Sequence, residues 1–243
     1  MTPEEAIGAA AGLGPYFAWQ PRDDDPAWRP LTDLHDPAVV AERVETARRT
    51  LMRMSGLGAG DLPARVVASI TFLGLAARLL SPPLAAAAVA GVPVTPDAGR
   101  LWWRPVDGGP IPVAYDTLGD RGSGLDLVLP ILAVFQRRYT LSAHVLTGNV
   151  ASALGGAAGM IADAAPAYAA RAAALVEEML AAPPLRDTAT LVRPDPDRER
   201  WFLVRRNCCL YYRIPGGGYC GDCVLTPEDE RRRQWRSVLT RGN

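Results

Sequence analysis

The sequence predicts a predominantly helical α+β fold, in which helices pack with a small antiparallel sheet. Apolar residues recur at helical spacing through most of the chain, strand-like runs are short, and proline or glycine clusters separate the segments. The chain has 243 residues, which is enough to bury a hydrophobic core in one large domain or two small ones. We expect an N-terminal helical region with a short strand pair in residues 1–120 and a second region in residues 121–243, and the two can form one continuous domain.

Two core helices are expected after a lead that is rich in tryptophan and proline. Asp36 is a suitable N-cap, Pro37 suits the first helical position, and apolar residues then recur at steps of four and three up to residues 55–60. A second apolar stripe predicts a helix that starts at Asp61 and stops at residues 81–83, Ser-Pro-Pro.

The middle of the chain predicts a strand pair followed by three more helices. Residues 101–103 and 111–116 are short strand-like runs on either side of a proline- and glycine-rich connection. Helical spacing resumes near Pro130 and continues to Tyr139, restarts after Ser142, and is followed by a further helix for which Asp163 is the expected cap.

The C-terminal part predicts a strand, a loop and a helix. After a break at residues 183–184, Pro-Pro, the runs 189–193 and 201–204 are expected to be strands joined by a turn. The last strand leads into a loop, and Thr226 followed by Pro227 and two acidic residues is a strong helix start.

Composition excludes several classes of function. Lys+Arg and Asp+Glu are equal at 26 each, so no basic footprint points to nucleic acid. The chain contains no lysine, which excludes P-loop nucleotide hydrolases, protein kinases and pyridoxal enzymes that depend on one. The two histidines, His35 and His144, stand in no metal-ligand spacing, and no G-x-S-x-G nucleophile motif occurs.

Nothing in the sequence predicts export or a transmembrane segment. The N-terminus is acidic where a secretory signal is basic. The longest apolar segments are interrupted by an arginine or by proline and fall short of a membrane span. These segments are 66–80, 84–94 and 125–135. We therefore expect a soluble, cytoplasmic protein.

All four cysteines lie in one segment, residues 205–226, between the last expected strand and the last expected helix. They are Cys208, Cys209, Cys220 and Cys223. Cysteines that serve packing would be scattered, whereas four thiols in one short stretch can reach a common inorganic centre. In a reducing cytosol such a cluster is better explained as a ligand set than as two disulfides. The segment indicates a metal or iron–sulfur site.

The spacing favours an iron–sulfur cluster over a single zinc ion. Structural zinc usually takes two separated C-x-x-C pairs, and here only Cys220 and Cys223 form one. The side chains of the adjacent Cys208 and Cys209 diverge on an extended chain, which suits a larger cluster with two metal corners better than one tetrahedral ion. A zinc site with four cysteines remains the alternative.

The pattern Cys-Cys, ten residues, Cys, two residues, Cys resembles that of FhuF-like ferric-siderophore reductases, as do residues 206–213, Arg-Asn-Cys-Cys-Leu-Tyr-Tyr-Arg. Residues 149–154, Asn-Val-Ala-Ser-Ala-Leu, are also similar to a segment of this family. The resemblance implies that the four cysteines bind a 2Fe–2S cluster and act through it as the catalytic redox centre. It implies one-electron reduction of siderophore-bound iron(III) in the cytosol. The C-terminal strand, loop and helix would then carry the cluster.

The resemblance also implies partners. No nicotinamide or flavin fingerprint is present, so electrons are expected from an external donor such as a ferredoxin or a flavin reductase. The substrate is expected to be a ferric siderophore, with hydroxamate types favoured. Two alternatives stay open: a zinc-binding structural or binding protein, and a non-catalytic relative of siderophore synthetases. The short chain and the absent lysine weaken the latter.

Charged and aromatic neighbours of the cysteines give further expectations. Arg205, Arg206 and Arg213 should favour the more negative reduced cluster and raise its potential, while Asp222 should lower it. The tyrosines at 211, 212 and 219 are expected to pack rather than to contact a substrate.

Small residues are expected to form one face of the helix after Ser142. They are Gly148, Ser152, Gly155, Gly156 and Gly159. Such a face usually allows close packing against a neighbouring element, and only occasionally forms a ligand groove.

Overall fold

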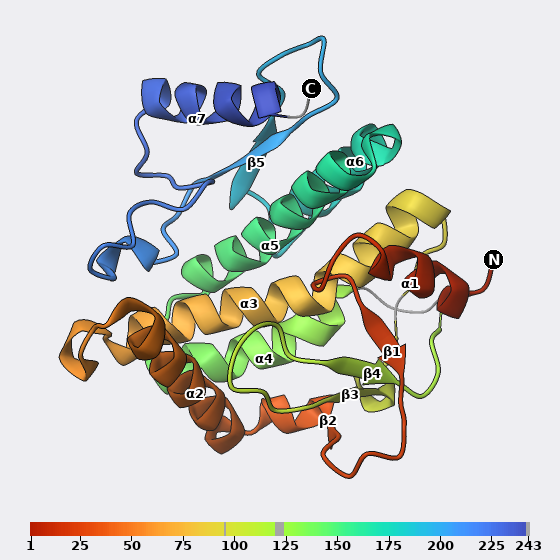
Figure 1. Ribbon diagram of the computed structural model, residues 1–243, viewed down its shortest axis with the longest axis vertical. Coiled ribbons are helices and arrows are strands. Elements are labelled where there is room, and N and C mark those ends of the chain that lie inside the picture. The colour runs from red at the N-terminus through yellow and green to blue at the C-terminus, as the bar shows by residue number, and fades with distance from the viewer. Residues whose placement is uncertain (95, 120–123, 242–243) are drawn as a thin grey trace.

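The computed structural model describes residues 1–94, 96–119 and 124–241, and within them the fold is α+β and predominantly helical, as expected (Figure 1). The helices are α1 (Pro3–Ala11), α2 (Pro37–Ser55), α3 (Ala64–Ala85), α4 (Gly124–Tyr139), α5 (Ala143–Ala164), α6 (Ala169–Ala181) and α7 (Glu228–Arg241). The strands are β1 (Trp19–Pro21), β2 (Arg29–Pro30), β3 (Leu101–Trp103), β4 (Val113–Tyr115), β5 (Ala189–Val192) and β6 (Phe202–Arg205).

Helices α3 and α5 lie side by side at the centre of the molecule (Figure 1). Most of their side chains are buried, and Phe72 of α3 packs against Phe135 of α4 with ring centroids 5.3 Å apart. One core cluster includes side chains from Ala6 through to Ile214, so both expected regions contribute to the same core. The proposed boundary between residues 120 and 121 lies outside the described residues.

Among the described residues, two helical runs are long and apolar enough to cross a membrane, Ala64–Ala90 and Ala143–Ala164, but 72% of each apolar window is buried inside the protein. They are therefore explained as core helices of a globular fold. The expectation that Pro82 and Pro83 would separate the apolar segments 66–80 and 84–94 was wrong, because α3 passes through both prolines.

Helix α3 continues through the two prolines, and a donor from outside the helix satisfies one of the carbonyls that they leave without an N–H partner. Pro82 cannot donate to the carbonyl of Arg78, and the indole Nε1 of Trp19 donates to that carbonyl instead, at 3.2 Å. The hydroxyl of Ser81 donates to the carbonyl of Ala77 at 2.6 Å. A π-helical turn over Ala86–Ala90 follows, and the helix ends at Gly91 in a left-handed conformation with φ 74°.

The buried Arg78 side chain joins α3 to the sheet. Its guanidinium donates to the carbonyls of Ile111 at 2.6 Å, of Tyr16 at 3.1 Å and of Ala18. Burial lowers the pKa of Arg78 to about 10, so the group stays charged at neutral pH. A charged, buried donor that satisfies three carbonyls holds the sheet against this helix.

The four-stranded sheet has the order β1-β4-β3-β2. Strands β3 and β4 pair antiparallel, with Leu101 opposite Tyr115, as the sequence predicted. Strand β2 also pairs antiparallel with β3, but β1 pairs parallel with β4, so the sheet is mixed rather than antiparallel. The sequence did not predict β1 and β2, because both are very short and end in proline.

Four helix starts differ from the prediction. Helix α4 starts at Gly124 rather than near Pro130, which lies inside it. The second helix starts at Ala64 and not at Asp61, because Asp61 accepts the N–H of Gly58 at 2.9 Å within a 3₁₀ turn. Asp163 lies in the last turn of α5 instead of capping α6. Helix α7 starts at Glu228, and the hydroxyl of Thr226 has no partner among the described residues.

The small-residue face of α5 lets the β5–β6 hairpin approach closely, as expected. A Cβ on Gly155 would lie 2.6 Å from the Cβ of Leu203 in β6, and one on Gly148 would lie 1.9 Å from Oδ1 of Asn207. Contacts this short do not occur between real side chains, so both positions require glycine in this packing. Gly156 differs, because no atom lies within 4 Å of its Cβ position.

We expect Gly155→Ala to destabilise the protein and Gly156→Ala, its neighbour on α5, to have the opposite effect. The added methyl at 155 must push β6 away, which should lower the free energy of unfolding by roughly 1–3 kcal/mol. At 156 the methyl meets open space and improves helix propensity, which should raise that free energy by up to about 1 kcal/mol. Urea unfolding followed by circular dichroism measures both. Equal stability of the two variants would contradict the packing described.

Candidate iron–sulfur site

The cysteine segment, residues 205–226, lies between β6 and α7, as the sequence predicted. It crosses the ends of α3 and α5 at one side of the molecule and contains a short 3₁₀ turn, Tyr211–Arg213 (Figure 1). Gly216 and Gly218 both have positive φ, 74° and 67°, so the glycine run forms a tight turn between the two cysteine pairs.

The four cysteines are all free thiols, and they differ in burial. Cys209 and Cys223 are buried at 2% and 3% exposure, while Cys208 and Cys220 are half-buried. The Sγ atoms of Cys209 and Cys220 are 3.6 Å apart. Within residues 1–94, 96–119 and 124–241, no three histidine, cysteine or acidic side chains converge on one metal position. The structure thus brings the sulfurs of Cys209 and Cys220 into contact, and the sulfurs of Cys208 and Cys223 are not part of that contact.

Backbone N–H groups point at the other two sulfurs. The N–H of Leu210 donates to Sγ of Cys208 at 3.3 Å, and the N–H of Leu225 donates to Sγ of Cys223 at 3.4 Å. Hydrogen bonds from the backbone to cysteine sulfur are one of the means by which proteins stabilise iron–sulfur clusters and set their potentials. The local backbone therefore suits thiolate ligands at both positions.

The Cys209–Cys220 contact favours one thiolate in the pair. The hydrogen bond from Cys220 lowers the pKa of Cys209 to about 6, against the opposing effect of burial. The same contact raises the pKa of Cys220, which keeps its proton. Burial also raises the pKa of Cys208. A cation that takes the place of this proton would allow both sulfurs to ionise.

A chain of buried polar groups connects the cysteine segment to the core helices. Nη2 of Arg205 donates to Oδ1 of Asn149 at 2.7 Å and to Oδ1 of Asn207 at 2.9 Å. Nδ2 of Asn149 donates to the hydroxyl oxygen of Ser69 at 3.0 Å and to its carbonyl at 2.8 Å. The hydroxyl of Ser69 donates in turn to the carbonyl of Cys209 at 2.7 Å.

Arg205 fits a site for an anionic group. Its side chain is 1% exposed, and Nε and Nη1 have no hydrogen-bond partner among the described residues; Nδ2 of Asn207 has none either. A buried guanidinium with unpaired N–H groups is costly unless an anion lies nearby. A cluster with four thiolates supplies that negative charge, and Arg205 lies close enough to lower the pKa of Cys209. The donor set and the unpaired donors both fit an iron–sulfur cluster.

The other two arginines that were expected to act on the cluster are exposed. Arg206 forms an ion pair with Asp187 at 3.3 Å, and Arg213 lies beside the ring of Tyr212. Water and counterions screen such charges, so of the three arginines Arg205 should influence a bound cluster most.

The surface of the segment is more apolar than expected. Tyr212 and Tyr219 are 41% and 54% exposed, so the expectation that they pack was wrong, while Tyr211 does pack against the core. Val224 and Leu225, later in the same segment, are exposed as well. These four side chains make up half of the large hydrophobic side chains that are exposed in the described part of the chain.

Helix α7 is also connected to the segment. Nη2 of Arg231 donates to the carbonyl of Cys223 at 3.0 Å and to the carbonyl of Thr226 at 2.9 Å. The ring of Trp235 stacks on Phe202 of β6, with centroids 5.2 Å apart. These contacts attach a helix whose residues are otherwise mostly polar and exposed.

Comparison with known families agrees with this site. Residues 205–225 match the family model described as the FhuF 2Fe-2S C-terminal domain, and Cys208, Cys209, Cys220 and Cys223 fit its motif. No curated protein matches the chain. The match confirms the resemblance over the cysteine segment and indicates a 2Fe–2S cluster as the cofactor. That all four cysteines are its ligands stays a prediction.

The sequence did not reveal the buried polar chain. Asn149 belonged to a segment that resembled the family, but Ser69 carried no signal of its own. The two side chains are 80 positions apart in the sequence, and only the packing of α3 on α5 brings them together.

We expect Arg205→Met to lower the midpoint potential of the bound cluster. Removal of a buried positive charge disfavours the more negative reduced state, and a charge at this burial should be worth on the order of 50 mV. Arg206→Met is the matched control, because it removes an adjacent but exposed charge and should shift the potential much less. Redox titration followed by electron paramagnetic resonance measures both. Equal shifts in the two variants would contradict the role given to Arg205.

Proposed function

We propose that this protein is a ferric-siderophore reductase, which reduces siderophore-bound iron(III) to iron(II) by one electron and so releases the iron in the cytosol. The observation that carries the proposal is the cysteine segment, which matches a 2Fe-2S family and is built around a buried guanidinium with unpaired donors. A bound 2Fe–2S cluster supplies single-electron transfer. The chain itself supplies the thiolates, the N–H donors to sulfur and the buried positive charge of Arg205.

The reaction balances with one electron and one iron. An iron(III) chelate accepts one electron and becomes an iron(II) chelate, and no bond to the protein is formed or broken. Hard oxygen donors of hydroxamate or catecholate type suit iron(III) far better than iron(II), so the reduced metal dissociates and the freed chelate oxygens take up protons. We favour hydroxamate siderophores as substrates.

The electron comes from an external reductant, for which we propose a ferredoxin or a flavin reductase. The exposed side chains of the cysteine segment support a docking role, because they include Tyr212, Tyr219, Val224 and Leu225, and Arg213 lies over the ring of Tyr212. Exposed apolar side chains grouped with a positive charge are typical of sites that bind an acidic protein partner. The cytoplasm provides such donors, and we place the protein there.

The proposal predicts the colour and redox behaviour of the purified protein. Protein purified without oxygen should be brown, should bleach on addition of dithionite, and should give an electron paramagnetic resonance signal when reduced. The reduced protein should turn over a ferric trihydroxamate, measured as iron(II) trapped by a coloured ferrous chelator. A colourless protein with stoichiometric zinc would instead support the zinc-binding alternative and overturn the proposal.

The proposal also predicts that Cys209→Ser loses iron, acid-labile sulfide and reductase activity together. Cys209 is buried beside Cys220 and bonded through its carbonyl to Ser69, so no other thiol can take its place. Met54→Ser is the control, since Met54 is an exposed sulfur-containing side chain on α2 and should leave all three quantities unchanged. A normal iron and sulfide content in Cys209→Ser would remove Cys209 from the ligand set.

A further inference from the structure

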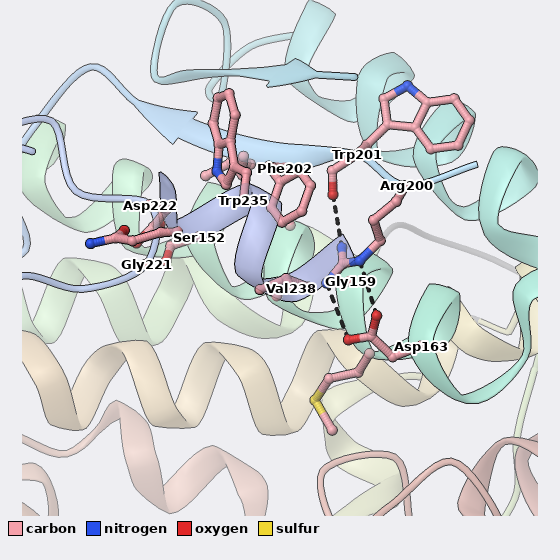
Figure 2. A pocket seen from close by; sticks show the side chains of 15 residues that line it. Ser152, Gly159, Asp163, Arg200, Trp201, Phe202, Gly221, Asp222, Trp235 and Val238 are labelled. Carbon is pink, nitrogen blue, oxygen red and sulfur yellow. Dashed lines mark hydrogen bonds and ion pairs between the residues drawn. The ribbon is translucent and has the colours of Figure 1, made fainter. Parts of the chain in front are cut away.

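A cleft of about 380 Å³ opens beside the cysteine segment, between α5, β6 and α7 (Figure 2). Its floor is the small-residue face of α5, one wall is formed by Phe202 and Trp235, and Gly221 and Asp222 form another. At the far end, Arg200 points toward Asp163 and away from the cysteine segment (Figure 2). The helix face for which packing was the main expectation therefore also lines a groove.

We propose that this cleft binds the ferric siderophore, and that it favours uncharged or cationic complexes over anionic ones. The inference rests on the proposed reductase function, for which it names the substrate site.

The cleft lies against the loop that holds two of the predicted cluster ligands. Gly221 and Asp222 are the two residues between Cys220 and Cys223, so a chelate in the cleft would contact the loop that holds two of the predicted cluster ligands. The backbone N–H of Arg205 donates to the carbonyl of Asp222 at 3.1 Å, which fixes this wall to the end of β6. An electron acceptor has to lie close to the redox centre, and the cleft provides that place.

The shape of the cleft suits a bulky, partly apolar complex. Gly156 has no atom within 4 Å of its Cβ position, so its side of the floor is open space rather than packed interior. The opposite wall is rigid, because the indole of Trp235 stacks on Phe202 with an interplanar angle of 25°. Largely apolar walls with a few polar groups are typical of small-molecule sites.

Two residues that line the cleft each carry a buried polar atom without a partner among the described residues. Trp235 is only 8% exposed, and its Nε1 has no hydrogen-bond partner in the part of the chain that the structure describes. Oδ2 of Asp222 is likewise buried without a partner among those residues. Both atoms are covered in the structure as it stands, so a chelate reaches them only after the atoms that cover them move aside. The indole N–H can then donate to a chelate oxygen, and the carboxylate can accept from an amide or ammonium N–H of the siderophore.

The charges that line the cleft set the preference between complexes. Arg200 and Asp163 neutralise each other through two hydrogen bonds, at 3.0 and 3.1 Å. Asp222 is then the one charged lining group, among the described residues, that has no opposite charge within the cleft. An iron(III) tricatecholate carries net negative charge and would meet this carboxylate at low dielectric, whereas an iron(III) trihydroxamate core is uncharged.

Binding of gallium(III) complexes to the holoprotein tests the inference, because gallium(III) resembles iron(III) in its oxygen ligands but is not reduced. Titration calorimetry with a gallium trihydroxamate should show binding to the wild type, and a gallium tricatecholate should bind roughly tenfold more weakly or worse. Gly156→Leu, which fills the open floor, should weaken trihydroxamate binding roughly tenfold or more. Gly8→Leu is the matched control, since Gly8 is an exposed glycine of α1 with no atom near its Cβ position.

Trp235→Phe provides a second, independent variant. It keeps an aromatic ring against Phe202 but removes the N–H, and should weaken trihydroxamate binding roughly fivefold. Thermal unfolding and the reduced-state resonance signal of each variant show that the fold and the cluster are intact. Wild-type affinity in both Gly156→Leu and Trp235→Phe would overturn the cleft as the site.

The two proposals fail in different ways. If the wild-type protein reduces a ferric trihydroxamate and the cleft variants do so with unchanged KM, the cleft inference is wrong and the reductase function stands. If the wild type binds the gallium complex through the cleft but transfers no electron to the ferric complex, the reductase function is wrong and the binding site stands.

Discussion

The placement of the cysteine segment depends on the buried guanidinium of Arg205. Arg205 is the last residue of β6, and its side chain donates to Asn149 on α5. Asn149 donates to Ser69 on α3, and the hydroxyl of Ser69 donates to the carbonyl of Cys209. A charge inside a protein is tolerated where its donors are satisfied. The chain of contacts satisfies one nitrogen of Arg205 and leaves the other two without a partner among the described residues. A bound cluster with four thiolates would supply the negative charge that these two nitrogens lack.

Helix α5 serves the core, the cluster segment and the cleft with successive residues of one face. Gly148 makes room for Asn207, and Gly155 lets β6 pack closely. Asn149, next to Gly148, accepts a hydrogen bond from Arg205. Gly156, next to Gly155, is open to the cleft. Because a helix is stiff, these positions keep a fixed spacing along its axis. The distance between the substrate cleft and the cysteine segment is therefore set by the helix rather than by the loops around it.

The parts of this fold that could be predicted have local signals. Helix α2 follows from Asp36 as a cap and Pro37 behind it, and the cysteine segment follows from residue type and spacing. Prediction failed where contacts with residues distant in the sequence determine the local structure. Helix α3 passes through Pro82 and Pro83 because Trp19, 59 positions before Arg78, donates to the carbonyl that a proline leaves unpaired. Tyrosine is a residue type that commonly packs, and only the path of the loop shows that Tyr212 and Tyr219 face water.

Arg231 gives helix α7 a second role. It holds the carbonyl of Cys223, while Trp235, one turn further along the same helix, forms a wall of the cleft. Helix α7 therefore contacts both the cysteine segment and the cleft. By thermodynamic reciprocity, if a bound chelate shifts the midpoint potential of the cluster, the oxidation state must change the affinity for that chelate by the same factor. If the chelate raises that potential, the reduced protein binds it more tightly than the oxidised protein does. Release of the chelate would then follow the transfer of the electron.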